Sequence, residues 1–373
     1  MGQNPTSGVL SLQRRREIYA LCSKYDIIIV EDDPYWYLQY PTSTAINTTT
    51  TSDASNTSFN PHMPMFANAE PQPDSWKQSG YPFLDSLVPS FVSVDTDGRV
   101  IRLDTFSKTV APGCRLGWIT AQPELVERIL RITETSTQQP SGFVQSMIAE
   151  LILGPDHSGL QDPKAAKKGG KGGLPDGEGW KADGWVRWLE GLRGNYERRM
   201  NQMSRLLDDG KYLVKSGRRN SLSSDEDEWS VVEKTQLYSF QWPIGGMFIW
   251  LKVHFENHPL YSTYAKSHEL PRLSRALWIF WTTKPYLVLV SPGTIFSPTD
   301  DIRDREGYKF FRLCFAAINE DQLAPTTKRI AEGVAGFWRI KDKKTIDRLL
   351  ADDDVVVEGR AGLAELAQMM GPC

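Results

Sequence analysis

Long apolar runs are missing from this 373-residue sequence, and no stretch approaches the roughly 18 consecutive apolar residues that a membrane-spanning helix needs. The N-terminus shows no basic segment followed by an apolar run, so no secretory signal is visible. Cysteine is scarce, and Cys22, Cys114, Cys314 and Cys373 form no CxxC pair, which argues against a disulfide framework or structural zinc. We therefore expect a cytoplasmic protein with no membrane partner.

An excess of positive charge is absent as well. The 43 basic and 46 acidic residues give a net charge of -3, which excludes the basic footprint of a dedicated nucleic-acid binder and favours a small-molecule partner. The five histidines form no ligand cluster, because His254 and His258 share helical spacing but Pro259 follows them. We expect these two histidines in a loop or on a helix surface, and no metal site.

The first third of the chain reads as an α/β layer. Ser11–Tyr25 has apolar residues at helical spacing, with Ser11 as the expected cap. Asp26–Val30 is a continuous β-branched run, which predicts a parallel strand buried on both faces. Val100–Asp104 and Arg115–Thr120 are predicted as further strands, and strands that alternate with helices indicate an α/β fold.

Three segments interrupt this pattern and are expected to be surface insertions. Between residues 41 and 60, eleven of twenty residues are Ser or Thr, a composition that cannot bury enough apolar area to offset chain entropy. Pro163–Gly177 interleaves lysines with glycines, and Ser216–Glu228 ends in an acidic run.

The rest of the chain predicts an α+β domain. Trp185–Leu207 has the apolar spacing of a long helix that could link two domains. Strands are predicted in Leu237–Val253, Tyr286–Val290 and Phe310–Ile318, and a helix over Asn319–Ile340.

Two groups of polar residues follow the predicted parallel strands. Asp32 belongs to an acidic run directly after the first strand, where open α/β sheets place ligand sites, although such residues can also cap a turn or meet solvent. Lys108 follows the next strand, with Thr105 and Ser107 before it and Arg115 seven residues later. Hydroxyls and a guanidinium suit a phosphate, and a partly withdrawn lysine can attack a carbonyl; a surface lysine is the alternative.

Arg312 interrupts a strand that is otherwise apolar on both faces. Because buried charges are seldom left unpaired, its partner is either a structural carboxylate or the carboxylate of a ligand. These residues alone do not decide between the two.

Taken together, the motifs resemble pyridoxal-phosphate enzymes of the aspartate-aminotransferase fold. The strings Gln3-Asn4-Pro5-Thr6, Glu31-Asp32-Asp33-Pro34-Tyr35 and Asp104-Thr105-Phe106-Ser107-Lys108, followed by Arg115 and Arg312, occur in the order of that family. They look most like the aromatic amino acid, 2-aminoadipate and kynurenine aminotransferase branch. The resemblance implies pyridoxal 5'-phosphate as cofactor, an amino acid and a 2-oxo acid as substrates, and a homodimer when the protein is complete.

The resemblance also implies a role for each motif residue. Lys108 would be the catalytic lysine that binds the cofactor covalently, and Asp32 would pair with its pyridine nitrogen. The other implied cofactor ligands are Asn4 and Tyr35 at the phenolic oxygen and Thr105, Ser107 and Arg115 at the phosphate. Arg312, together with Asn4, would bind the substrate carboxylate.

The implied fold is an α/β class, namely part of a large cofactor-binding domain with a mostly parallel sheet, plus a small α+β domain. Residues 1–184 would be the C-terminal part of the large domain, with insertions near 41–76 and 155–180. Residues 185–209 would be a linking helix and 210–373 the small domain.

Two departures from the family pattern bear on activity. Ser7 stands where the family usually has glycine after Asn-Pro-Thr, so we expect a slightly different loop. The family has a substantial region before this motif, which stacks on the ring and binds phosphate, so residues 1–373 alone are expected to hold the cofactor poorly. Alternatives to transamination are a non-catalytic remnant or fragment, or a lyase or decarboxylase on the same fold.

Overall fold

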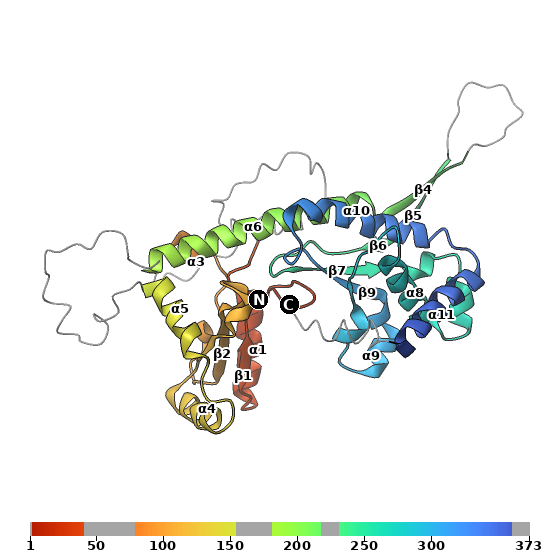
Figure 1. Cartoon of the computed structure of the whole chain (residues 1–373). Coiled ribbons are helices and arrows are strands. Elements are labelled where there is room, and N and C mark those ends of the chain that lie inside the picture. Colours follow the sequence, from red (N-terminus) through yellow and green to blue (C-terminus); the bar gives the residue numbers. More distant parts are fainter. Residues whose placement is uncertain (1, 41–78, 154–180, 218–230, 360–373) are drawn as a thin grey trace, which may run out of the picture. The chain divides into compact units, whose positions relative to one another are not determined.

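A computed structural model of the chain describes residues 2–40, 79–153, 181–217 and 231–359 (Figure 1). The predicted insertions near 41–76 and 155–180 lie outside the described residues, as do residues 218–228 of the third predicted loop. The first two residues of that loop, Ser216 and Gly217, instead belong to a strand. The chain divides into two compact units. Unit 1 comprises Met1–Gln3, Gly8–Asn195 and Ile244–Gly246; unit 2 comprises Asn4–Ser7, Tyr196–Pro243 and Met247–Cys373.

Unit 1 contains a three-stranded sheet with helices around it. Its elements in chain order are α1 (Leu12–Lys24), β1 (Ile29–Asp32), α3 (Pro82–Asp85), η1 (Phe91–Val94), β2 (Val100–Thr105), η2 (Phe106–Lys108), η3 (Pro112–Cys114), β3 (Gly117–Thr120), α4 (Pro123–Thr135) and α5 (Gly142–Leu153), where η marks a 3-10 helix. Helix α6 (Lys181–Asp209) contributes residues to both units, since the division falls between Asn195 and Tyr196. The predicted division into a large domain, a linking helix and a small domain stays a prediction.

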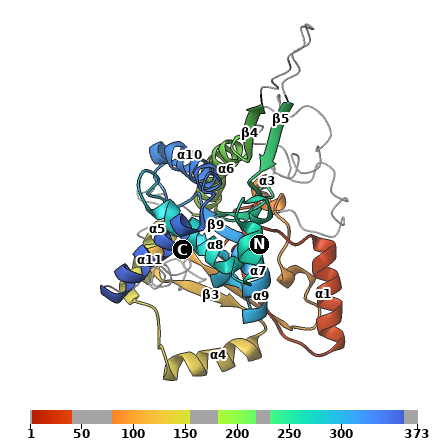
Figure 2. The ribbon, with the colours of Figure 1, turned by 90° about the vertical axis from the view of Figure 1, so that its right-hand side faces the viewer.

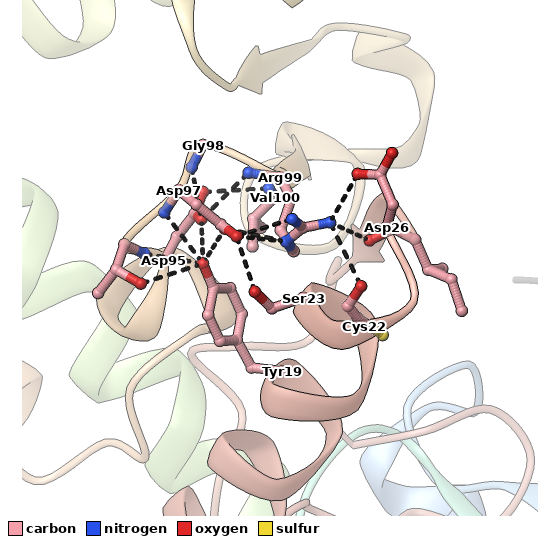
Figure 3. Close-up of polar contacts among 11 residues, drawn as sticks. Tyr19, Cys22, Ser23, Asp26, Asp95, Asp97, Gly98, Arg99 and Val100 are labelled. Atoms are coloured by element: carbon pink, nitrogen blue, oxygen red, sulfur yellow. Dashed lines mark hydrogen bonds and ion pairs between the residues drawn. The ribbon is translucent and has the colours of Figure 1, made fainter.

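The first helix begins where the sequence predicts. The side chain of Ser11 accepts a hydrogen bond from the Arg14 amide at 3.2 Å, which satisfies one of the free N–H groups at the start of α1. The second half of α1 contacts the turn before β2, because the hydroxyl of the buried Tyr19 donates to Asp95 and Asp97 (Figure 3). Asp95 in turn accepts from the Val100 amide at 3.0 Å, so this cluster joins α1 to the first residue of β2.

Strands β1 and β2 pair in parallel as expected, but the predicted burial of both faces of the first strand is wrong. Ile28 is 52% and Val30 is 60% exposed, whereas Glu31 is buried. Successive side chains of a strand point to opposite faces, and the described residues cover the Glu31 face of β1. Strand β3 pairs antiparallel with β2, a direction that the apolar pattern does not specify.

Unit 2 is built on a four-stranded antiparallel sheet in the order β6-β7-β9-β8. Its elements after α6 are β4 (Tyr212–Gly217), β5 (Val231–Gln236), β6 (Tyr238–Ser239), β7 (Phe248–Val253), η6 (Phe255–Asn257), α7 (Tyr261–Lys266), α8 (Leu270–Thr282), β8 (Ser291–Pro292), η7 (Gly293–Phe296), α9 (Asp300–Arg305), η8 (Gly307–Lys309), β9 (Phe310–Cys314), α10 (Glu320–Phe337) and α11 (Lys343–Gly359). Strands β4 and β5 form a separate antiparallel hairpin (Figure 2). The α/β and α+β classes predicted for the two parts of the fold are confirmed.

The core of unit 2 lies where helices meet this sheet. Trp281 of α8 is fully buried, its ring packs edge-on against Phe311 of β9 at 5.0 Å, and its indole N–H donates to the Ile330 carbonyl of α10 at 3.0 Å. Helix α10 begins after Asn319, as predicted. The apolar spacing thus locates α10 correctly, whereas α8 was not predicted.

The prediction of a strand over Tyr286–Val290 is wrong. The Val288 amide donates to the Trp281 carbonyl at 2.8 Å, and the Val290 carbonyl accepts from the Trp278 indole at 2.7 Å. These backbone groups therefore bond to α8 and not to a strand, although the β-branched residues match a strand pattern.

His258 lies in a loop after η6, one of the two predicted positions, but it is buried there, at only 3% exposed. Its Nδ1 accepts from the Leu260 amide at 3.1 Å, and its Nε2 lies 3.2 Å from the Phe337 carbonyl. Burial lowers the pKa of His258 to about 4, so the ring is neutral at physiological pH.

No helix among the described residues combines the length and the apolar character needed to cross a membrane.

Candidate functional site

The parallel pairing of β1 and β2 brings their C-terminal ends to one edge of the unit 1 sheet. Asp32 lies opposite Leu103, and the next amide, that of Asp33, donates to the Leu103 carbonyl at 3.1 Å. Lys108 follows the end of β2 by three residues. The residues that the sequence singles out after each strand are therefore held at the same edge, the usual ligand-binding edge of an open α/β sheet.

The acidic run after β1 separates into two environments. Glu31 and Asp33 are buried on one face, while Asp32 is exposed on the other, as the strand period of two requires. Glu31 is held by the Arg15 guanidinium at 2.5 Å and by the Phe91 amide at 3.0 Å. Of the three carboxylates, Asp32 is the one presented to a partner at this edge.

Arg102 connects the two strand ends in this region and was not among the residues predicted from the sequence. Its guanidinium makes two 2.8 Å hydrogen bonds to Asp104, lies 3.5 Å from Glu31 and 3.8 Å from Asp33, and stacks on the Trp36 ring. A charged residue inside an apolar strand was the available signal, the same one that draws attention to Arg312. Because Arg102 bonds to residues of both strands, it holds their ends in register.

Burial raises the pKa of Asp33 to about 6, with the nearby Glu31 charge acting in the same direction and Arg102 opposing it. Asp33 is only 2% exposed. Its environment is therefore that of a structural carboxylate, in contrast to its exposed neighbour Asp32.

The lysine segment is organised by hydroxyl groups. The Thr105 side chain caps η2 by accepting from the Ser107 amide at 3.1 Å, and the two hydroxyls lie 3.0 Å apart. Lys108 is half-buried, and its Nζ lies 5.9 Å from the centre of the Tyr35 ring. The structure thus places Lys108, Tyr35, Thr105 and Ser107 in one neighbourhood of unit 1.

Arg115 is exposed and adopts a left-handed backbone conformation with φ of 45° at the end of η3. The following residue, Leu116, accepts hydrogen bonds from the Thr105 hydroxyl at 3.2 Å and from the Phe106 amide at 3.0 Å. The backbone of Arg115 is therefore anchored beside the Thr105–Ser107 hydroxyls, and its exposed side chain can reach an anion in solution.

In unit 2, Arg312 is 7% exposed and donates from its two terminal nitrogens to Asn4 Oδ1 at 2.9 Å and Ser291 Oγ at 3.2 Å. The guanidinium carbon also lies 4.3 Å from the centre of the Phe248 ring and 4.8 Å from that of Phe296. These contacts fix the plane of the guanidinium, as a bidentate carboxylate ligand requires. Ser291 has no local sequence signal and was not predicted.

The residue types in unit 1 fit the groups of pyridoxal phosphate. A half-buried amine suits the aldehyde, an exposed carboxylate suits a protonated pyridine nitrogen, and hydroxyls beside a guanidinium suit the phosphate. Lys108, Asp32, Tyr35, Thr105 and Ser107 are the residues that would hold these groups. When bound, this cofactor supplies a ring that accepts electron density from the α-carbon of an amino acid. Within the described residues, no three His, Cys, Asp or Glu side chains gather to bind a metal.

Comparison with known proteins finds matches to aminotransferases. Residues 3–162 match the family described as aminotransferase class I and II. The chain is 36% identical over 259 residues to the L-tyrosine:2-oxoglutarate aminotransferase atrD of Tapinella panuoides, covering 69% of this chain and 36% of that protein. It is 35% identical over 330 residues to the aromatic amino acid aminotransferase C56E4.03 of Schizosaccharomyces pombe, covering 88% of this chain and 53% of that protein.

Among solved structures, the aminotransferase Aro8 from Candida albicans superposes with a TM-score of 0.60 at 27% identity. The match covers 91% of this chain and 56% of that structure, so the chain spans about half the length of this relative. The predicted resemblance is confirmed by both sequence and fold. The chain thus resembles, in sequence and in fold, the aminotransferases of class I and II, including relatives named as tyrosine and aromatic amino acid aminotransferases.

Proposed function

We propose that the complete protein is a pyridoxal-phosphate-dependent aminotransferase. It would move the amino group of an amino acid to a 2-oxo acid, so that the donor becomes a 2-oxo acid and the acceptor becomes an amino acid. The observation that carries the proposal is the position of half-buried Lys108 beside Tyr35, at the sheet edge that also presents Asp32.

The unit 1 residues have distinct roles in this proposal. Lys108 would hold the cofactor covalently, and its amine would carry the proton of the substrate α-carbon. Asp32 would pair with the ring nitrogen, because its exposed carboxylate lies at the same sheet edge as Lys108. Thr105, Ser107 and Arg115 hold the phosphate.

The remaining ligands come from the residues around Arg312. The guanidinium binds the substrate carboxylate with the planar geometry that Ser291 and the two phenylalanine rings impose. Asn4 completes this group through its hydrogen bond to Arg312, and Asn4 and Tyr35 also serve the phenolic oxygen of the cofactor.

The names of two relatives support a substrate class. Two proteins to which the chain is at least 35% identical are named as tyrosine and aromatic amino acid aminotransferases. We propose an amino donor of the aromatic, kynurenine or 2-aminoadipate type.

The test is to trap the lysine in the complete protein. Borohydride reduction after incubation with pyridoxal phosphate, followed by peptide mapping, is expected to leave a pyridoxyl group on Lys108. Lys108→Ala is expected to abolish both labelling and amino transfer, whereas Lys309→Ala, at a lysine paired with Glu306 in unit 2, preserves them.

Product analysis with 2-oxoglutarate separates transamination from its alternatives. Stoichiometric glutamate supports the proposal, and release of carbon dioxide or ammonia without glutamate indicates a decarboxylase or lyase. Label on another lysine, or no label with an intact fold, rejects the assignment of Lys108.

We further propose that the complete protein is a cytosolic homodimer. Among the described residues, Cys22, Cys114 and Cys314 form no disulfide, which fits a reducing compartment. The dimer rests on the family resemblance, and light scattering after size-exclusion chromatography measures it directly.

A further inference from the structure

The segment that carries Lys108 is short and tightly hydrogen-bonded. The Phe106 carbonyl accepts from the amides of Thr109, Val110 and Ala111 at 3.2, 2.8 and 3.2 Å. The backbone therefore closes into a compact turn around the lysine, held by three amides that share one carbonyl.

The carbonyl of Thr109 has a specific side-chain partner. The indole N–H of Trp188, from α6, donates to the Thr109 oxygen at 2.6 Å. Thr109 is only 3% exposed, so its carbonyl is shielded from water and depends on a protein donor. Trp188 itself is 40% exposed, so the position is not explained by burial of an apolar ring alone.

Other aromatic residues hold the same segment by packing. The Phe106 ring lies 5.0 Å from Trp118 of β3 and 5.9 Å from Trp185 of α6, centre to centre. The segment Phe106–Thr109 is thus held by ring packing at Phe106 and by the indole hydrogen bond at Thr109, and Lys108 lies between these two residues.

We propose that Trp188 is a positioning residue for Lys108, which acts through the Thr109 carbonyl to fix the backbone from which the lysine side chain projects. The inference rests on the proposed function for its catalytic consequence. Losing the indole N–H leaves the turn with one fixed end, so the lysine amine samples a wider range of positions.

The primary test uses amide hydrogen exchange in the cofactor-free protein, so that it does not depend on transamination. Replacing Trp188 with 3-benzothienylalanine puts sulfur in place of the N–H and keeps the ring shape; Trp188→Phe is the second variant. Both are expected to raise exchange at Lys108–Ala111 about tenfold. The matched control is Trp281→Phe, which removes an indole bond to the Ile330 carbonyl in unit 2.

Three results would overturn the proposal: no change at Lys108–Ala111 in either Trp188 variant, the same increase in Trp281→Phe, or an increase spread evenly over unit 1. A second readout is the rate of borohydride trapping at Lys108, expected to fall several-fold in the Trp188 variants with binding of the substrate carboxylate unchanged. If wild-type protein is not labelled at Lys108, the proposed function fails, and the exchange data still decide whether Trp188 fixes the turn.

Discussion

Arg312 and Asn4 are 308 positions apart in the chain, yet the Arg312 guanidinium donates to the Asn4 side-chain oxygen at 2.9 Å. The pair joins a residue of β9 to the Asn-Pro-Thr motif, so two motifs that are isolated in the sequence belong to one polar group in unit 2. A neutral amide keeps the arginine oriented without cancelling its charge, which suits a guanidinium that binds a carboxylate.

Replacing Arg312 with lysine tests this role. The charge is kept but the planar fork is lost, so kcat/KM for amino transfer is expected to fall about tenfold or more, a cost of roughly 1.4 kcal/mol or above. The control is Arg305→Lys, since Arg305 is exposed and pairs with Asp301 on α9. Unchanged kinetics with a lower melting temperature would show that Arg312 is structural.

Replacement by asparagine is expected to have different effects on the stability of the protein at the neighbouring carboxylates Asp32 and Asp33. The folded-state pKa of Asp33, about 6, lies above its ordinary value of 3.8, so the folded protein binds more protons in that interval and the free energy of unfolding falls as pH rises through it. Asp33→Asn should therefore stabilise the protein at pH 7, by up to about 3 kcal/mol, and remove this slope.

Asp32→Asn is the matched variant, because Asp32 is exposed. It should leave urea unfolding unchanged and weaken cofactor retention after desalting. If Asp33→Asn instead destabilises the protein at pH 7, the attraction between Asp33 and Arg102 outweighs the cost of burial.

Ser7 has a left-handed backbone with φ of 59°, and its buried hydroxyl donates to the Phe248 carbonyl at 2.5 Å. Ser7→Ala loses the hydrogen bond and retains the unfavourable φ, so it should lower the free energy of unfolding by about 1–3 kcal/mol. Ser7→Gly should cost roughly 1 kcal/mol less than that, because glycine accepts positive φ.

Ser274 provides the comparison, since its buried hydroxyl donates to the Tyr308 carbonyl at 2.6 Å from within helix α8. Glycine is unfavourable in a helix, so Ser274→Gly should cost more than Ser274→Ala, the reverse of the order at Ser7. Urea unfolding of the four variants measures this, and the same order at both sites would contradict the account of Ser7.

The lowered pKa of His258 predicts that the free energy of unfolding falls in mild acid. Its folded-state pKa of about 4 lies below its ordinary value of 6.5, so its contribution is fully present above pH 6.5 and is lost as pH falls toward 4. The size of this loss is about 3 kcal/mol. His258→Gln should flatten this part of the pH profile of urea unfolding, while His268→Asn, at an exposed histidine, should not. Equal profiles for wild type and His258→Gln would exclude His258 as the cause.

The local features of the fold were accessible from the sequence because short-range forces produce them. Ser11 caps α1 through a bond to Arg14, three residues away, and the β-branched run after α1 leads into a strand. The same pattern failed at Tyr286–Val290, where bonds to α8 replace a strand ladder. A β-branched segment specifies an extended backbone but not the partner of its hydrogen bonds.

For the candidate site, the sequence by itself determined the residue types, namely the lysine and hydroxyls after β2, Asp32 after β1, and an arginine inside an apolar strand. The tertiary structure alone decided their partners: Asn4 and Ser291 for Arg312, Tyr35 for Lys108, and Trp188 for the Thr109 carbonyl. The physical reason is range. Capping and strand periodicity act over a few residues, whereas these contacts join segments tens to hundreds of residues apart, and only the folded path of the chain brings them together.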